Sequence, residues 1–236
     1  MDLKNYKRIV ELQHQFNLDV FPDYLDKKLN WNNAIIAESG ELLDSLGYKW
    51  WKKQVPDMDN VKVETIDLLH FVVSEQIDLA YNSKNSIGSS IDIVATTMED
   101  FFEEEDTYEE FNFDCSLNNL VDMLNYDQYD RFFILKQMFK KLEMNNEDVY
   151  LAYIVKNCLN QFRQNNGYKD GSYIKNWNDK EDNVVAYALA NIIGAKENLF
   201  DELHESLNLY YNKEVLKVTK VSVVDTLDYF GCNKIN

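Results

Sequence analysis

The sequence predicts an all-α protein, and three features favour this fold class. Apolar residues recur at helical spacing in successive segments, rather than with the alternation of strands. The chain holds only 7 Gly and 2 Pro, which is few for a turn-rich β protein. Hydrophobic residues make up 45% of the 236 residues, so a single large helical domain has enough apolar side chains for a core.

We expect a helical bundle that carries two acidic metal-binding helices. Its core comprises about residues 1–81 and 147–212, with a variable helical insertion at about 82–146. The first helix covers residues 2–17, and a linker that contains Pro22 follows it. The further expected helices, each with an apolar face, occupy residues 31–46, 60–81, 87–102, 117–125, 128–142, 147–162, 182–193 and 195–212.

The two acidic helices each carry a pair of carboxylates at a spacing of three residues. Glu38 and Glu41 lie in the second expected helix, and Glu64 and Asp67 lie in the third. This spacing places both members of a pair on one face, within reach of one cation. Carboxylate oxygens suit Mg²⁺ or Mn²⁺ better than zinc. Small residues beside the first pair leave room for ions and water, namely Ala34, Ala37 and Ser45.

An ordinary solvated face is the alternative interpretation of any single acidic pair. Two consecutive helices with the same spacing favour the metal site, because crowded like charges cost free energy unless a cation offsets them.

Composition also restricts the partners. The net charge of −17 argues against a nucleic-acid partner, which requires clustered Lys and Arg. We expect no disulfide framework from Cys115, Cys158 and Cys232, and no membrane span. A reducing cytoplasm is therefore the expected location. The acidic run from Glu103 to Glu110 is either a solvated surface or a patch that binds a protein partner.

A polar segment from Arg163 to Lys175 interrupts the helical pattern. It contains Gly167 and Gly171 and gathers positive charge in an otherwise acidic chain. Such a segment is suited to wrap a polyphosphate, whose oxygens accept hydrogen bonds from Lys and Arg. A plain surface turn is the alternative.

These residues resemble the dimeric dUTPases, within the all-α nucleoside triphosphate pyrophosphohydrolase superfamily. The resemblance reaches to about residue 190, with residues 82–148 matching only as a variable helical region. The motifs that carry it are Leu12-Gln-His-Gln-Phe-Asn17, Glu38-Ser-Gly-Glu41 with Trp51, Glu64-Thr-Ile-Asp67-Leu-Leu-His70-Phe71, Lys156-Asn-Cys-Leu-Asn160-Gln-Phe-Arg163 with its continuation to Lys175, and Trp177-Asn-Asp-Lys-Glu-Asp-Asn183.

The resemblance implies hydrolysis of dUTP, and of dUDP, to dUMP by a homodimer. Two or more Mg²⁺ ions, for which Mn²⁺ substitutes, would be held by Glu38, Glu41, Glu64 and Asp67. Glu38 is expected to take the proton of the attacking water, with Glu41 as the competing choice. Such an enzyme keeps uracil out of DNA and supplies dUMP. The richness of the chain in Asn, Lys, Ile and Tyr suits an AT-rich genome, so we expect a bacterial or phage-infected host cell.

The resemblance also implies residues that bind the nucleotide. The uracil and deoxyribose would contact Gln13, Asn17, Trp51, His70 and Phe71. The phosphates would contact Lys156, Asn160, Arg163, Lys169 and Lys175. Phe71 as ordinary core and His70 as a structural side chain are the alternatives.

Two other functions remain open from the sequence. A related pyrophosphohydrolase for another nucleotide, such as dCTP, would keep the four carboxylates and change the base pocket. A nucleotide-gated regulator would use the acidic middle region to bind a protein and would not need turnover.

Overall fold

The structure is a computed structural model that describes residues 1–104, 116–126, 130–194 and 198–217. Most of these residues are helical, which confirms the predicted all-α class. The chain divides into two compact units, Met1–Tyr153 and Ile154–Asn236. None of the described helices is both long enough and apolar enough to cross a membrane.

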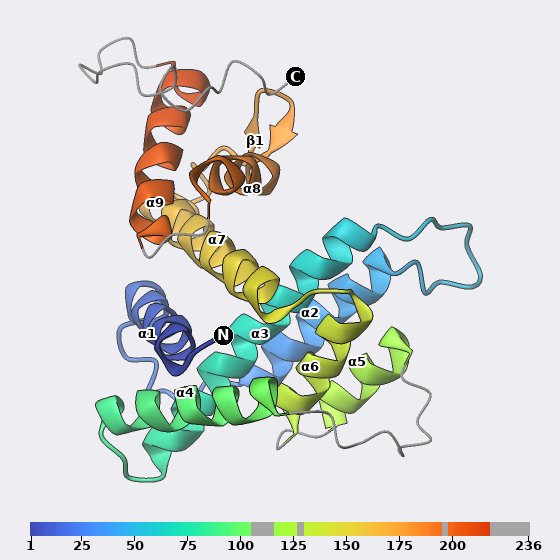
Figure 1. Cartoon of the computed structure of the whole chain (residues 1–236). Helices are drawn as coiled ribbons and strands as arrows, with labels where there is room; N and C mark the ends of the chain where they lie inside the picture. The colour runs from blue at the N-terminus through green and yellow to red at the C-terminus, as the bar shows by residue number, and fades with distance from the viewer. Residues whose placement is uncertain (105–115, 127–129, 195–197, 218–236) are drawn as a thin grey trace. The chain divides into compact units, whose positions relative to one another are not determined.

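The first unit is a bundle arranged around one central helix (Figure 1). That helix, α3, packs against α1, α2, α4 and α6, so the middle of the chain is part of the bundle. Leu68, Leu69 and Val72 of α3 are fully buried. The helices are α1 (Leu3–Val20), α2 (Trp31–Ser45), α3 (Met58–Asn82), α4 (Ile87–Glu103), α5 (Leu117–Tyr126), α6 (Arg131–Lys141) and the first part of α7 (Asn146–Asn165).

Side chains cap the first four helices at their N-termini. In each case an oxygen of the capping residue accepts a hydrogen bond from a backbone N–H in the first turn, which satisfies a donor that the helix itself leaves without a partner. The capping residues are Asp2, Asn30, Asp57 and Ser86.

A buried ion pair and the hydrogen bonds around it join four of the helices. Arg131 of α6, only 2% exposed, forms a bidentate pair with Glu75 of α3 and donates to Asn32 of α2. Its Nε also donates to the carbonyl of Leu124, at 2.9 Å. Glu75 lies on the same helix as Glu64 and Asp67, but its charge is compensated inside the protein.

The second unit surrounds an aromatic cluster. Trp177 is fully buried, and its ring centroid lies 5.7 Å from that of Phe162 and 5.2 Å from that of Tyr211. The elements of this unit are the rest of α7, β1 (Asn176–Trp177), β2 (Lys180–Glu181), α8 (Asp182–Ile193), α9 (Leu199–Tyr210) and a π-helical turn (Tyr211–Val215).

The β1–β2 hairpin was not predicted from the sequence. Its turn residues, Asn178 and Asp179, have φ values of 49° and 65°, a conformation that Asn and Asp tolerate better than most residues. Other differences are small: the helix expected from residue 128 begins at Arg131, and the one expected from 195 begins at Leu199. The acidic run beyond 104, Cys115, Cys232 and the chain after 217 lie outside the described residues.

Candidate active site

Helices α2 and α3 run antiparallel and bring acidic side chains from both helices together. Ser45 at the end of α2 contacts Asn60 at the start of α3, while Trp31 at the start of α2 contacts Asp78 near the end of α3. Between these contacts, Glu38, Glu41 and Glu64 have carboxylate oxygens within 4.8 Å of one another. Three of the four expected ligands therefore lie together.

Asp67 is not a member of that group. It lies one turn after Glu64 on α3 and is partly exposed. The spacing within one helix places Asp67 on the same face as Glu64, but it does not specify how close its carboxylate comes to those of α2.

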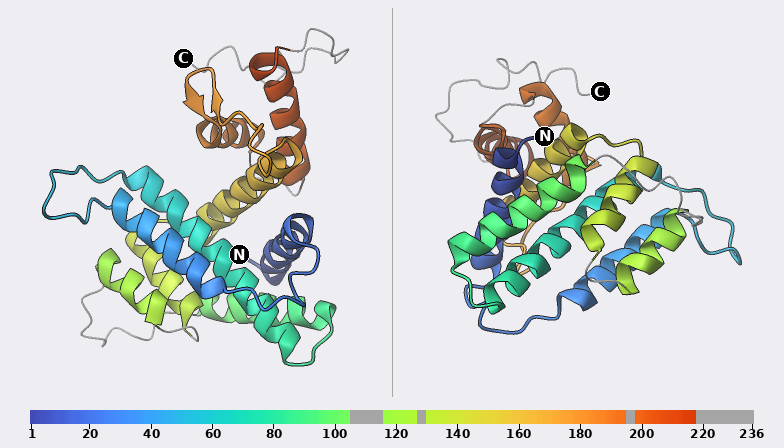
Figure 2. Two further views of the ribbon diagram at one scale, coloured as in Figure 1. Left: turned by 180° about the vertical axis from the view of Figure 1, so that it is seen from behind. Right: turned by 60° about the horizontal axis from the view of Figure 1, so that its bottom comes forward.

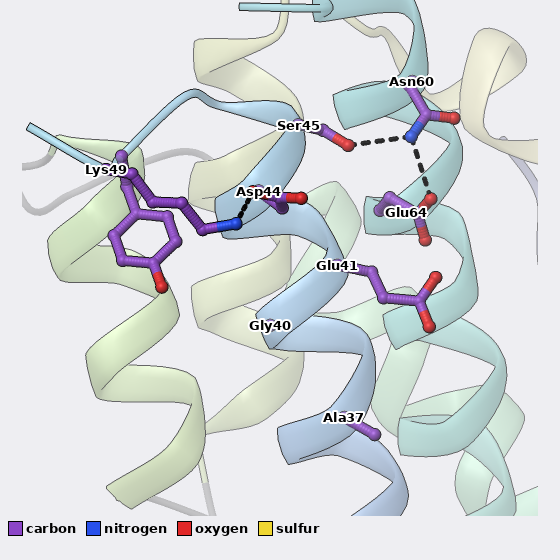
Figure 3. A pocket seen from close by; sticks show the side chains of 9 residues that line it. Ala37, Gly40, Glu41, Asp44, Ser45, Lys49, Asn60 and Glu64 are labelled. Atoms are coloured by element: carbon purple, nitrogen blue, oxygen red, sulfur yellow. Dashed lines mark hydrogen bonds and ion pairs between the residues drawn. The ribbon is translucent and has the colours of Figure 1, made fainter. Parts of the chain in front are cut away.

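A pocket of about 430 Å³ opens beside the carboxylates (Figure 3), a volume typical of small-molecule sites. Small side chains make the space, as expected for Ala37 and Ser45. Gly40 contributes as well, since a Cβ added there would meet nothing within 4 Å. The lining residues are Ala37, Gly40, Glu41, Asp44, Ser45, Tyr48, Lys49, Asn60 and Glu64.

The acidic group has the chemistry of a divalent-cation site. Three carboxylates from two helices supply hard oxygen donors, and Glu64 is only 8% exposed. Crowding them without a cation costs free energy, because like charges repel more strongly away from bulk water. The residues present therefore fit a divalent ion such as Mg²⁺ or Mn²⁺.

Asp44 at the edge of the pocket has its charge compensated within the protein. Lys49 Nζ forms an ion pair with it, and Gln54 Nε2 donates to it at 3.2 Å. These two hydrogen bonds lower the pKa of Asp44. Lys49 thus places a positive charge on the wall of an otherwise acidic pocket.

The expected uracil-binding amides lie together in a buried hydrogen-bonded cluster. Gln13 Nε2 donates to Asn17 Oδ1 and to Ser74 Oγ, both at 3.0 Å, and Asn17 Nδ2 donates to Ser74 Oγ at 3.1 Å. Gln13 and Asn17 are 3% and 7% exposed. Their amide groups are therefore engaged with one another and with α3.

Tyr153 also belongs to this cluster, although the sequence analysis did not predict it as a site residue. Its hydroxyl donates to Gln13 Oε1 at 2.7 Å. Its ring stacks on His70, with centroids 4.0 Å apart and an interplanar angle of 11°. His70 Nδ1 lies 2.8 Å from the carbonyl oxygen of Ile66, while Phe71, the next residue, is partly exposed.

Trp51 does not lie with the amide cluster. It is 60% exposed, and its ring contacts are with Tyr48 and Trp50 in the same connection. That connection extends from the end of the α2–α3 hairpin, away from α1, in both Figures 1 and 2. Ser74, in contrast, lies about 24 Å along α3 from Met58, at about 1.5 Å per residue.

In the second unit, Arg163 is held by a residue that sequence reasoning missed. Its Nε and Nη2 each donate to a carboxylate oxygen of Asp182 at 2.8 Å. Asp182 is fully buried and also accepts from the Tyr173 hydroxyl at 2.7 Å. Burial and this hydrogen bond raise the pKa of Tyr173. The available signal was an acidic residue in the first turn of a helix, near one of the chain's few arginines.

The other expected phosphate-binding residues of this unit differ in exposure. Lys156 is 8% exposed, and Asn160 Oδ1 accepts from Arg163 Nη1 at 3.2 Å. Lys169 and Lys175 are exposed. The segment between Arg163 and Lys175 folds through a turn at Gly167, whose φ of 91° favours glycine.

A family model described as dUTPase matches residues 5–168, which include the carboxylates, the amide cluster and α7. The chain belongs to the all-α dUTPase family. It is accordingly a hydrolase that binds and cleaves dUTP, in a family that is generally metal-dependent. The match ends before Lys169, Lys175 and Asp182. No curated protein was found to be similar to the chain.

Proposed function

We propose that this dUTPase hydrolyses dUTP and dUDP to dUMP in a Mg²⁺-dependent reaction, releasing pyrophosphate or phosphate. The observation that carries the proposal is the group of carboxylate oxygens from Glu38, Glu41 and Glu64, within 4.8 Å of one another beside the pocket. Asp67, one turn further along α3, is proposed as the fourth ligand. Mn²⁺ is expected to substitute for Mg²⁺.

The chemical step is in-line attack of water on phosphorus. Bound divalent ions neutralise phosphate oxygens and lower the pKa of coordinated water. Glu38 is proposed to take the proton of the attacking water, with Glu41 as the alternative base. Both side chains project from α2, so the helix backbone fixes the spacing between them.

Base selection is proposed to rest on Gln13 and Asn17. Their amides offer both donors and acceptors, which suits the O2, N3–H and O4 edge of uracil. Because these amides already hydrogen-bond to protein groups in the structure, uracil has to share or replace those partners. His70 and Phe71 are proposed to abut the deoxyribose, with Phe71 excluding a 2′-hydroxyl. Trp51 is proposed to pack on the base; because it lies away from Gln13 and Asn17 in this structure, the α2–α3 connection has to move toward α1 for it to do so.

The phosphate contacts are proposed to come from Lys156, Asn160, Arg163, Lys169 and Lys175. Arg163 has its Nε and Nη2 on Asp182, so the guanidinium is held in one orientation. A fixed guanidinium fork loses less entropy when it binds a phosphate oxygen. We further propose a homodimer in the cytoplasm of a bacterial or phage-infected cell, and a role of the acidic middle region in binding a protein.

The experiment is pyrophosphate release from a panel of deoxynucleoside triphosphates, with Mg²⁺ and after chelation. Rapid release from dUTP alone, lost on chelation and restored by Mg²⁺, is the expected result. Preference for dCTP would instead assign a related pyrophosphohydrolase. Binding of nucleotide without turnover would favour the regulator.

A further inference from the structure

Asn60 links the two helices that carry the acidic group. It lies one turn before Glu64 on α3, and its Nδ2 donates to Glu64 Oε1 at 3.0 Å (Figure 3). The same nitrogen donates to Ser45 Oγ of α2 at 2.8 Å. The backbone N–H of Asn60 donates to the capping residue Asp57, at 3.1 Å. Hydrogen bonds therefore hold both the backbone and the side chain of Asn60.

The orientation of the Asn60 amide follows from its partner. An ionised carboxylate only accepts hydrogen bonds, so the amide must present its NH₂ group to Glu64. This bond occupies one acceptor position on Oε1 and leaves the other oxygen and the remaining lone pairs for further partners. It also opposes rotation of the Glu64 side chain away from the like charges of Glu38 and Glu41.

The Asn60 amide is neutral, whereas Lys49, which pairs with the carboxylate of Asp44 in the same pocket, is charged. Lys49 brings a full positive charge to Asp44 and compensates it. Asn60 orients Glu64 without bringing a positive charge to it, so the carboxylate keeps its formal charge for a cation. Groups that hydrogen-bond to metal-ligating side chains in this way typically tune metal affinity by about 10- to 100-fold.

We propose that Asn60 is a positioning residue that holds the Glu64 carboxylate for a divalent cation, through its hydrogen bonds to Glu64 and Ser45. This inference rests on the proposed metal-dependent function. It assigns Asn60 a role in cation binding and none in contacting the nucleotide.

The test is the affinity of the nucleotide-free protein for Mn²⁺ alone, measured from the electron paramagnetic resonance signal of free Mn²⁺. Asn60→Ala is expected to weaken Mn²⁺ binding by about 10- to 100-fold. The matched control is Asn82→Ala. Asn82 donates a similar bond, at 2.9 Å, to Asp78 near the other end of α3, so its removal is expected to leave Mn²⁺ affinity at the wild-type value.

Comparison of the two variants separates positioning from general stability. Each loses one amide-to-carboxylate bond of α3, so their thermal unfolding without metal should be similar. Unchanged Mn²⁺ affinity in Asn60→Ala, or an equal loss in Asn82→Ala, would overturn the inference. If Asn60→Ala does not fold, Ser45→Ala detaches Asn60 from α2 and should weaken Mn²⁺ binding in the same direction; wild-type affinity there would overturn the inference as well.

The outcome for the wild-type protein distinguishes this inference from the proposed function. If the wild-type protein binds no Mn²⁺ and cleaves dUTP after chelation, both are wrong. If it binds Mn²⁺ and needs a divalent ion for turnover while Asn60→Ala binds Mn²⁺ equally well, only the role of Asn60 is wrong.

Discussion

Tyr153 donates a 2.7 Å hydrogen bond to Gln13, a residue 140 positions earlier in the chain. Both residues are buried, and the tyrosine ring stacks on His70. Gln13 Oε1, an acceptor suited to the N3–H of uracil, therefore already accepts one hydrogen bond from a phenol. A nucleotide that binds at Gln13 as proposed has to share this oxygen with the hydroxyl or displace it.

Tyr153→Phe should lower stability without weakening dUTP binding. Removing the hydroxyl leaves Gln13 Oε1 buried with one fewer donor, which typically costs about 1–3 kcal/mol. Uracil would supply a donor again in the complex. Urea unfolding and the KM for dUTP are the measurements, and a KM that rises strongly would show that the hydroxyl assists the substrate.

Glu38→Gln should abolish turnover while the fold remains intact. The amide keeps the shape of the side chain, but it neither accepts a proton nor anchors Mg²⁺ well, so a loss on the order of 100-fold or more is expected. Steady-state rates and circular dichroism test this, with the exposed Glu11→Gln as control. The corresponding Glu41→Gln rate shows which glutamate is the base; near-normal activity of Glu38→Gln would remove it from the site.

Asn17→Ala should weaken the choice of base more than the phosphate chemistry. A site built to hydrogen-bond a ring edge rejects analogues that leave its polar groups without partners, and the alanine removes part of that discrimination. The measurement is the ratio of kcat/KM for dUTP to those for dCTP and dTTP. Unchanged ratios would place base recognition on other residues.

Arg131→Met should destabilise the first unit strongly, by about 3–5 kcal/mol, because it leaves the Glu75 carboxylate buried without its cation. The double variant Arg131→Met with Glu75→Leu should recover much of this loss, since no uncompensated charge then remains. Urea unfolding of the two variants and the wild type tests the pair. A double variant no more stable than the single would show that the loss comes from packing.

His14 should make stability depend on pH. Burial lowers the pKa of His14 in the folded protein, and Nδ1 lies 2.6 Å from the Tyr24 hydroxyl. The unfolded histidine titrates near about pH 6.5. As the pH falls from about 7.5 to about 5.5, the unfolded state gains a proton that the folded state resists, so the free energy of unfolding decreases.

The control for this pH dependence is His14→Gln, which keeps an acceptor for Tyr24 and does not titrate. Urea unfolding at both pH values should show a smaller decrease in the variant than in the wild type. Equal decreases would assign the pH dependence to other groups, such as the carboxylates.

The helices could be predicted because their apolar periodicity is local, and the i, i+3 spacing of Glu38 and Glu41 follows from one helical turn. The β1–β2 hairpin could not, since strands of two residues contain no alternation to detect. Tyr153 was missed because its partner Gln13 is distant in sequence. Asp67 was expected in the acidic group but is not a member of it, because spacing along one helix does not specify the distance between side chains on two helices.

The connection between α2 and α3 is closed at its base, where the N–H of Asp57 donates to the carbonyl of Ser45 at 2.9 Å. Asp57 also caps α3, so the start of that helix is tied directly to the end of α2. This link does not depend on the length of the connection between them. Insertions or deletions between 46 and 56 should therefore be tolerated without shifting Glu64 against Glu41. A change of length in this stretch therefore alters Trp51 and the pocket wall at Tyr48 and Lys49, and leaves the spacing of the two acidic helices as it is.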